Sequence, residues 1–78
     1  MENLNKYNET FLKIFTSHKG NLSELKYQDI PEWDSIGHME LMSALENSFQ
    51  IEIEIDDIID FSSYSKGIEI LKKYSIQI

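Results

Sequence analysis

A serine among small and polar neighbours is the clearest candidate for chemistry in this chain. The residues concerned are consecutive: Asp34, Ser35, Ile36, Gly37 and His38. If a helix begins at this serine, its first backbone N–H groups lack intrahelical partners and its dipole favours negative charge, so a phosphate attached to Ser35 is well placed. Asp34 is a candidate N-cap, and its carboxylate could also meet a metal ion or a basic residue of a partner. Gly37 has no side chain, which we expect to leave room beside the serine.

A hydrolytic site is the weaker interpretation of the same residues. His38 follows Ser35 by three positions, so the two share one side of a helix, as a nucleophile and its base would. However, the serine is not enclosed by a G-x-S-x-G elbow, and the sequence offers no clear acid to orient the imidazole. We therefore predict that His38 contacts solvent or a partner.

The acidic run near the C-terminal third of the chain raises the question of a calcium site. Asp56, Asp57 and Asp60 are close in sequence, but the loop glycine and the distal glutamate of an EF-hand are missing. These three residues are therefore predicted to form a solvated acidic face.

Helical periodicity predicts the elements that position the serine, because apolar residues recur three and four positions apart. The predicted elements are a helix over about 3–17, a loop over 18–34, a second helix over about 35–49, a short helix over about 56–61 and a last helix over about 63–74. We expect Asn3 or Asn5 to cap the first helix and Ser62 or Ser63 to cap the last. His18, Lys19 and Gly20 suit the end of the first helix.

Three large side chains are assigned to the core, two from this periodicity and one from its place in the loop. Leu45 and Phe49 lie on the apolar band of the second predicted helix. Trp33, near the end of the long loop, is predicted to anchor that loop to the core.

Isoleucine and glutamate alternate from Ile51 to Ile55, which on its own favours a half-buried strand. No second strand is available for pairing, so the backbone groups of a lone strand would need other partners. We predict an extended connection whose isoleucines face the helices.

Composition limits the function classes. The 78 residues suffice for one domain over 1–78, which we expect to be an all-α bundle of three main helices and one short helix. Fourteen acidic residues against seven Lys and no Arg give a net charge of −7, which disfavours nucleic-acid binding. Cysteine is absent, which fits a reducing cytoplasm, and we predict no signal peptide, no membrane span and a monomer.

The serine and the residues after it resemble the acyl carrier protein family, whose hallmark is an Asp-Ser-Leu or Asp-Ser-Ile triplet opening the second helix of a small acidic bundle. Asp34, Ser35 and Ile36 match the triplet. The likeness continues through Glu40, Leu41, Ala44, Leu45, Glu46, Phe49 and Ile53. It implies that a phosphopantetheinyl transferase attaches 4′-phosphopantetheine from coenzyme A to Ser35, with Asp34, Ile36 and Gly37 beside it, and that the arm's thiol carries acyl groups as thioesters.

The resemblance also implies a carrier without catalytic activity, which presents its cargo to loading ligases or transferases and to synthases. Acidic residues would dock onto the basic surfaces of these enzymes around a small apolar centre. The predicted contact residues are Ile36, Met39, Glu40, Glu46, Asp56 and Asp57. Trp33, Glu32 and His38 depart from the pattern of housekeeping fatty-acid carriers, which leaves fatty-acid, polyketide and surface-polymer pathways open. A peptidyl or D-alanyl carrier and an unmodified helical interaction module are the alternatives.

Overall fold

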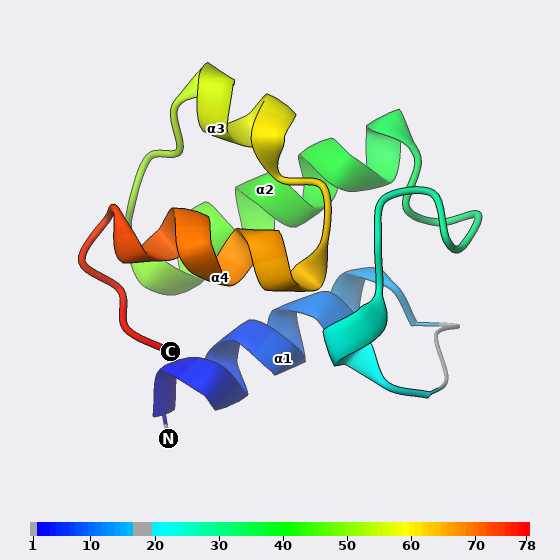
Figure 1. Ribbon diagram of the computed structural model, residues 1–78, viewed down its shortest axis with the longest axis horizontal. Helices are drawn as coiled ribbons and strands as arrows, with labels where there is room; N and C mark the ends of the chain where they lie inside the picture. The colour runs from blue at the N-terminus through cyan, green and yellow to red at the C-terminus, as the bar shows by residue number, and fades with distance from the viewer. Residues whose placement is uncertain (1, 17–19) are drawn as a thin grey trace.

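A computed structural model describes residues 2–16 and 20–78, and within them the chain is all-α. The elements are α1 (Glu2–Ile14), the 3-10 turn η1 (Leu22–Glu24), α2 (Ser35–Phe49), α3 (Ile55–Asp60) and α4 (Tyr64–Lys72). The predicted fold class, three longer helices and one short one with a long segment between the first two, is confirmed (Figure 1).

Local signals place α2, α3 and α4 within two residues of their predicted bounds. The bounds of α2 are those predicted, and Ser63 caps α4 by accepting a hydrogen bond from the backbone N–H of Lys66 at 3.0 Å. For the first helix the predicted start lies within one residue of the observed one, but the predicted cap and the predicted C-terminal end were wrong. α1 begins at Glu2, so Asn3 and Asn5 lie inside it, and it ends at Ile14 rather than at 17.

The segment after α1 still contains the predicted left-handed glycine. Gly20 has φ +118°, a conformation that glycine adopts without a steric penalty. The predicted helix-end residues His18 and Lys19 lie outside the described residues. Residues 15 and 16, which were predicted to be helical, lie outside α1.

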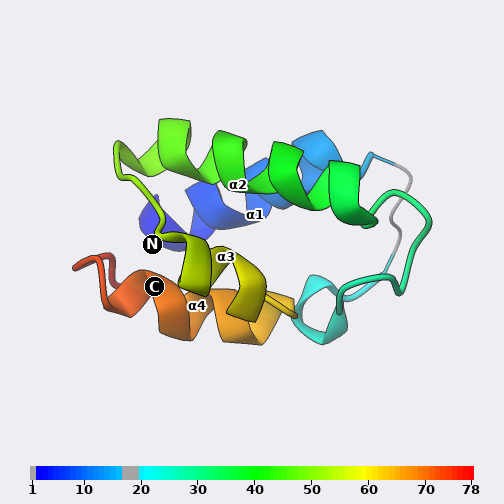
Figure 2. The same ribbon diagram turned by 90° about the horizontal axis from the view of Figure 1, so that it is seen from above.

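The helices pack in two layers (Figures 1 and 2). α1 and α2 lie side by side and run in opposite directions. α4 forms the other layer, below both of them in Figure 2, and runs in the direction of α2, with α3 at the edge between α2 and α4. The two ends of the chain meet, because the Asn3 side chain donates a hydrogen bond to the Gln77 carbonyl at 3.0 Å. The C-terminal segment thereby closes the bundle over the start of α1.

Aromatic side chains form the centre of the core. Trp33 is fully buried, stacked on Phe15 with ring centroids 5.2 Å apart and edge-on to Phe11 at 5.6 Å. The predicted anchoring of the loop by Trp33 is confirmed. Leu45 is buried as predicted, whereas Phe49 is only partly buried and has the Lys6 ammonium 5.4 Å from its ring centre.

The alternating segment is extended, as predicted, over residues 51–54. Its backbone finds side-chain partners in place of a second strand: the N–H of Ile53 donates to a Glu46 carboxylate oxygen at 2.8 Å, and that of Glu54 donates to the Tyr74 hydroxyl at 2.9 Å. Ile53 is buried, but Ile55 is 73% exposed, so the expectation that every isoleucine here faces the helices is wrong. Ile55 points outward because it opens α3, whose inner face is formed by other residues.

None of the helices within the described residues has the length and apolarity needed to cross a membrane.

Candidate functional site

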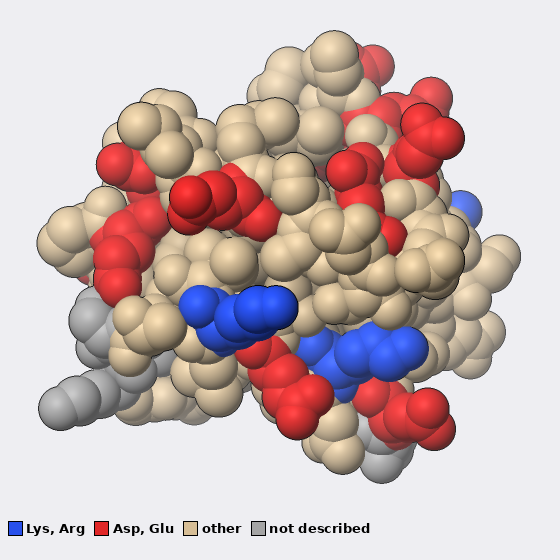
Figure 3. Space-filling model, turned by 180° about the vertical axis from the view of Figure 1, so that it is seen from behind, with Lys and Arg blue, Asp and Glu red and all other residues tan. Residues whose placement is uncertain are grey.

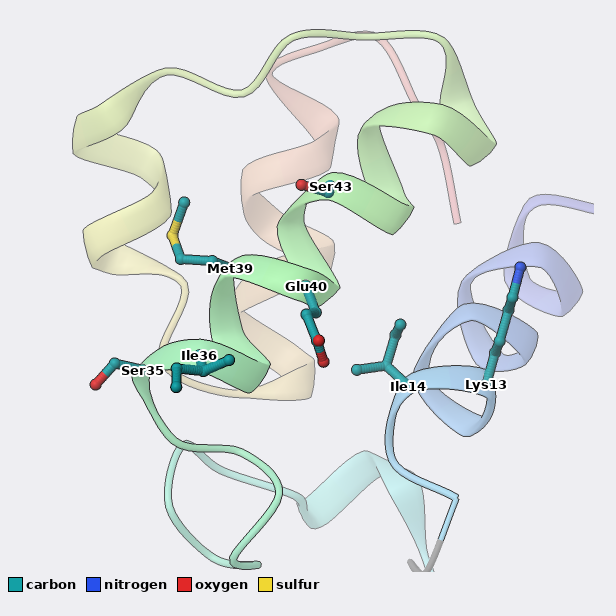
Figure 4. A pocket seen from close by; sticks show the side chains of 7 residues that line it. All are labelled: Lys13, Ile14, Ser35, Ile36, Met39, Glu40 and Ser43. Carbon is teal, nitrogen blue, oxygen red and sulfur yellow. The ribbon is translucent and has the colours of Figure 1, made fainter.

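Ser35 is the first residue of α2, and the turn before it leaves its hydroxyl free. Asp34 takes the capping role: its carboxylate accepts a hydrogen bond from the N–H of Gly37 at 2.8 Å, and its carbonyl accepts one from the N–H of His38 at 2.8 Å. The Ser35 side chain is exposed and makes no hydrogen bond to any residue in 2–16 or 20–78. It points outward at the end of the helix (Figure 4). The N-terminus of α2 thus carries an exposed hydroxyl that has no hydrogen-bond partner among the described residues.

Gly37 has a different role from the one predicted. A Cβ at this position would lie 1.8 Å from the carbonyl oxygen of Glu32, so the missing side chain makes space for the loop backbone and not for the serine. The close approach presses residues 32–34 against the first turn of α2. Gly37 therefore fixes the shape of the turn that presents Ser35.

His38 is the largest correction at the site. The prediction that it contacts solvent or a partner was wrong, because the ring is half-buried and both nitrogens are engaged. Nδ1 lies 2.9 Å from the indole nitrogen of Trp33, and Nε2 lies 2.8 Å from the carbonyl oxygen of Ile58 in α3. Neither nitrogen is free to take a proton from Ser35, so the arrangement offers no general base to that hydroxyl.

Large apolar side chains are exposed on α2, which carries the serine, and on α3. Ile36 is 73% exposed and Met39 52%, as expected for an apolar contact centre. Ile55 and Ile59 of α3, each 73% exposed, were not among the predicted contact residues. The available signal was their spacing of four, which puts both on one side of α3, away from the buried Asp57 and Phe61.

Two apolar hollows open on either side of Ser35. One lies between α1 and α2, where Ile14 faces Ile36 and Glu40 (Figure 4). The other lies between α2 and α3, has a volume of about 350 Å³ and is lined by Met39 and Ile59 among others. Ser35 and Met39 border both hollows, so a group attached to the serine could lie in either one.

The predicted docking acids divide into exposed and internal groups. Glu40 and Asp56 are exposed on α2 and α3. Glu46 is half-buried and uses one carboxylate oxygen to hold the N–H of Ile53. Asp57 is 5% exposed, so its assignment to a solvated docking face was wrong. Acidic side chains nevertheless spread over much of the face seen in Figure 3, where basic ones lie mainly in the lower part and at the right edge.

Asp57 is buried because it links α3 to the end of α4. Its two carboxylate oxygens accept hydrogen bonds from the Lys73 ammonium and the Tyr74 hydroxyl, each at 2.5 Å. These hydrogen bonds, Lys73 first, lower the pKa of the Asp57 carboxyl below its usual value of 3.8. The same contact raises the pKa of Lys73. The pair therefore stays ionised in neutral solution and acts as a structural tie.

Among residues 2–16 and 20–78, no group of three His, Asp or Glu side chains is arranged to hold a metal ion. Comparisons with protein-family models, with curated proteins and with solved structures gave no match.

Proposed function

We propose that this chain is an acyl carrier protein that holds acyl groups as thioesters on a 4′-phosphopantetheine arm attached to Ser35. The observation that carries the proposal is the exposed Ser35 hydroxyl, unshared with any described residue, on the first residue of a helix that the preceding Asp34 caps. A serine that served only as the helix cap would have used its oxygen on the backbone. In this structure the Ser35 oxygen stays accessible, which supports its modification by an enzyme.

The surroundings of Ser35 suit such an arm. In the first turn of α2 the N–H groups of Ser35 and Ile36 have no intrahelical acceptors, and the positive end of the helix dipole favours a phosphodiester. The apolar hollows on either side offer surfaces for a thioester-bound hydrocarbon. Asp34 and Gly37 support the site through the shape of the turn.

The attachment requires little from this chain beyond an accessible alcohol. Ser35 Oγ would form a bond to the phosphorus that bears pantetheine, the pyrophosphate bond of coenzyme A would break, and adenosine 3′,5′-bisphosphate would leave. The serine proton would pass to a base of the transferase, since both nitrogens of His38 are already hydrogen-bonded. The same engagement of His38 counts against a hydrolase that uses Ser35 as its nucleophile.

Partner enzymes would meet an apolar centre with an acidic rim. Ile36, Met39 and Ile59 supply exposed apolar area close to the serine, Glu40 supplies charge in the same part of α2, and Asp56 supplies charge on α3. Complementary Lys and Arg side chains on a loading ligase or a synthase would speed encounter, and salt would weaken it. A tethered cargo gains a high effective concentration at each such partner.

The test is modification in vitro. The purified chain is incubated with coenzyme A and a broad-specificity phosphopantetheinyl transferase, and its intact mass is measured. We expect the wild-type chain to gain one phosphopantetheine and Ser35→Ala to gain none. Ser62→Ala is the matched control, because Ser62 is also exposed and borders the hollow between α2 and α3, yet lies outside any helix. It should be modified like the wild type.

Two results would contradict the proposal. A wild-type chain that stays unmodified would favour an unmodified interaction module, and modification that survives in Ser35→Ala would place the arm elsewhere. The cargo is a separate question: the thioester released from chain purified from its native source distinguishes an acyl group from an aminoacyl group.

A further inference from the structure

The two hydrogen bonds of His38 fix its tautomer. The indole N–H of Trp33 can only donate, so Nδ1 of His38 must accept and carries no proton. The Ile58 carbonyl can only accept, so Nε2 of His38 must donate and carries the proton. One nitrogen must therefore accept and the other must donate, and the imidazole tautomer with its proton on Nε2 satisfies both hydrogen bonds.

Through these bonds the imidazole joins three parts of the fold. Trp33 belongs to the loop and lies two residues before Ser35, His38 lies in the first turns of α2, and Ile58 belongs to α3. Aromatic rings hold the imidazole on its other sides: Tyr27 has its ring centre 5.4 Å away and Phe61 6.1 Å away. The imidazole ring is therefore held in one orientation, and through it the position of the loop is coupled to the position of α3.

The position of α3 depends on few contacts. A helix of six residues is too short to be stable alone, so its place is set by what ties it down. At the far side, Asp57 binds Lys73 and Tyr74; at the side of Ser35, the Ile58 carbonyl binds His38. The hydrogen bond between His38 and the Ile58 carbonyl is thus a polar contact that sets the distance between α3 and the start of α2.

Ser35 and His38 border the same hollow between α2 and α3. Any movement of α3 or of the Trp33 loop changes the walls of this hollow and the turn that carries the serine. The transferase must reach Oγ in a defined geometry, and small displacements of a reacting group have large effects on rate.

We propose that His38 is a positioning residue for the modification of Ser35: by joining Trp33 to the Ile58 carbonyl, it holds the serine turn and α3 in the arrangement that the transferase acts on. This inference rests on the proposed function. His38 contacts neither coenzyme A nor Ser35 Oγ in the reaction, and it acts through the elements that it joins.

Three variants separate the two bonds. His38→Asn keeps an oxygen near the place of Nδ1 that can accept from Trp33, but its short side chain cannot reach Ile58. His38→Gln places an amide N–H near the former Nε2, where it can donate to Ile58. His38→Phe keeps a ring and loses both bonds. Tyr74→Phe is the control. It removes the hydroxyl that accepts a hydrogen bond from the Glu54 N–H and donates one to Asp57, and so weakens the polar contacts at the other side of α3.

The measured quantities are kcat and KM for transferase modification, taken at a temperature where circular dichroism shows every variant folded. We expect kcat to fall about tenfold or more in His38→Phe and by smaller factors in the Asn and Gln variants. KM should change little, because Ile36, Met39 and Glu40 still offer the docking surface. Tyr74→Phe should lower the melting temperature yet keep kcat within about twofold of the wild type.

Hydrogen exchange supplies a second readout that needs no transferase. Trp33 is the single tryptophan, so its indole N–H gives one resolved NMR signal. We expect His38→Phe to speed exchange of this proton and of the α3 amides together. Wild-type kcat in all three His38 variants, or a fall in kcat equal to that of Tyr74→Phe, would overturn the positioning role alone. A wild-type chain that takes no phosphopantetheine would overturn the proposed function itself.

Discussion

Replacing Gly37 by alanine should destabilise the protein, although the same change in most helices is stabilising. Alanine exceeds glycine in helix propensity by up to about 1 kcal/mol. At Gly37, however, the new Cβ would lie 1.8 Å from the carbonyl oxygen of Glu32. Ordinary contact begins near 3.4 Å, so this carbonyl would have to retreat by about 1.6 Å. The obstacle is backbone and cannot be relieved by a change of rotamer.

The size of the effect follows from two opposing terms. Overpacking of a close contact costs about 1–3 kcal/mol, and the propensity gain offsets up to about 1 kcal/mol of that. We expect Gly37→Ala to lower the free energy of unfolding by about 2 kcal/mol. For a domain of this length that corresponds to a fall in melting temperature of about 8–16 °C. The loop that carries Asp34 and Ser35 is the part that must move.

Thermal and urea unfolding, followed by circular dichroism, measure this change. Ser43→Ala is the control: Ser43 is exposed in the middle of α2, where alanine should alter stability by no more than about 0.5 kcal/mol. A Gly37→Ala variant that melts at or above the wild-type temperature would refute the argument, because the loop would then not be pressed against the first turn of α2.

Two further predictions concern the core and the buried ion pair. Leu45→Ala should lower the free energy of unfolding, measured in urea, by about 3 kcal/mol, and Phe49→Ala by only about 1–2 kcal/mol, because Leu45 is fully buried and Phe49 is not. Equal losses in the two variants would contradict this ranking. The lowered pKa of Asp57 implies that its stabilising effect is complete above its usual pKa of 3.8 and is lost as pH falls through the lower folded-state value. The difference in melting temperature between wild type and Asp57→Asn should therefore close on acidification below about pH 4, and a constant difference would count against the tie to Lys73 and Tyr74.

Features that depend on neighbouring residues in sequence were predictable. The start of α2 follows from Asp34, whose short carboxylate reaches the N–H groups of the next turn whatever the rest of the fold does. Ser63 caps α4 for the same reason. The core position of Leu45 follows from helical spacing alone.

Features that depend on distant partners were not predictable from pattern. His38 looks like a surface residue until Ile58, twenty positions later, is brought beside it. Asp57 looks like its exposed neighbour Asp56 until the end of α4 supplies Lys73 and Tyr74. A partial signal existed, because Asp57 lies four residues before the buried Phe61 and so shares its inward side of α3.

The distribution of exposed apolar residues supports the interpretation of the Ser35 region as a functional surface. Fully burying a side chain such as isoleucine contributes about 1.5–3 kcal/mol, and a domain of this size has little stability to spare. Four of the five largely exposed large apolar residues in the described chain are nevertheless Ile36, Met39, Ile55 and Ile59, in the first half of α2 and in α3. Scattered exposed residues need no explanation, but a concentration on the two helices beside one free serine hydroxyl does. Core packing does not account for that placement, whereas contact with partners or with a tethered cargo would, on the proposed function.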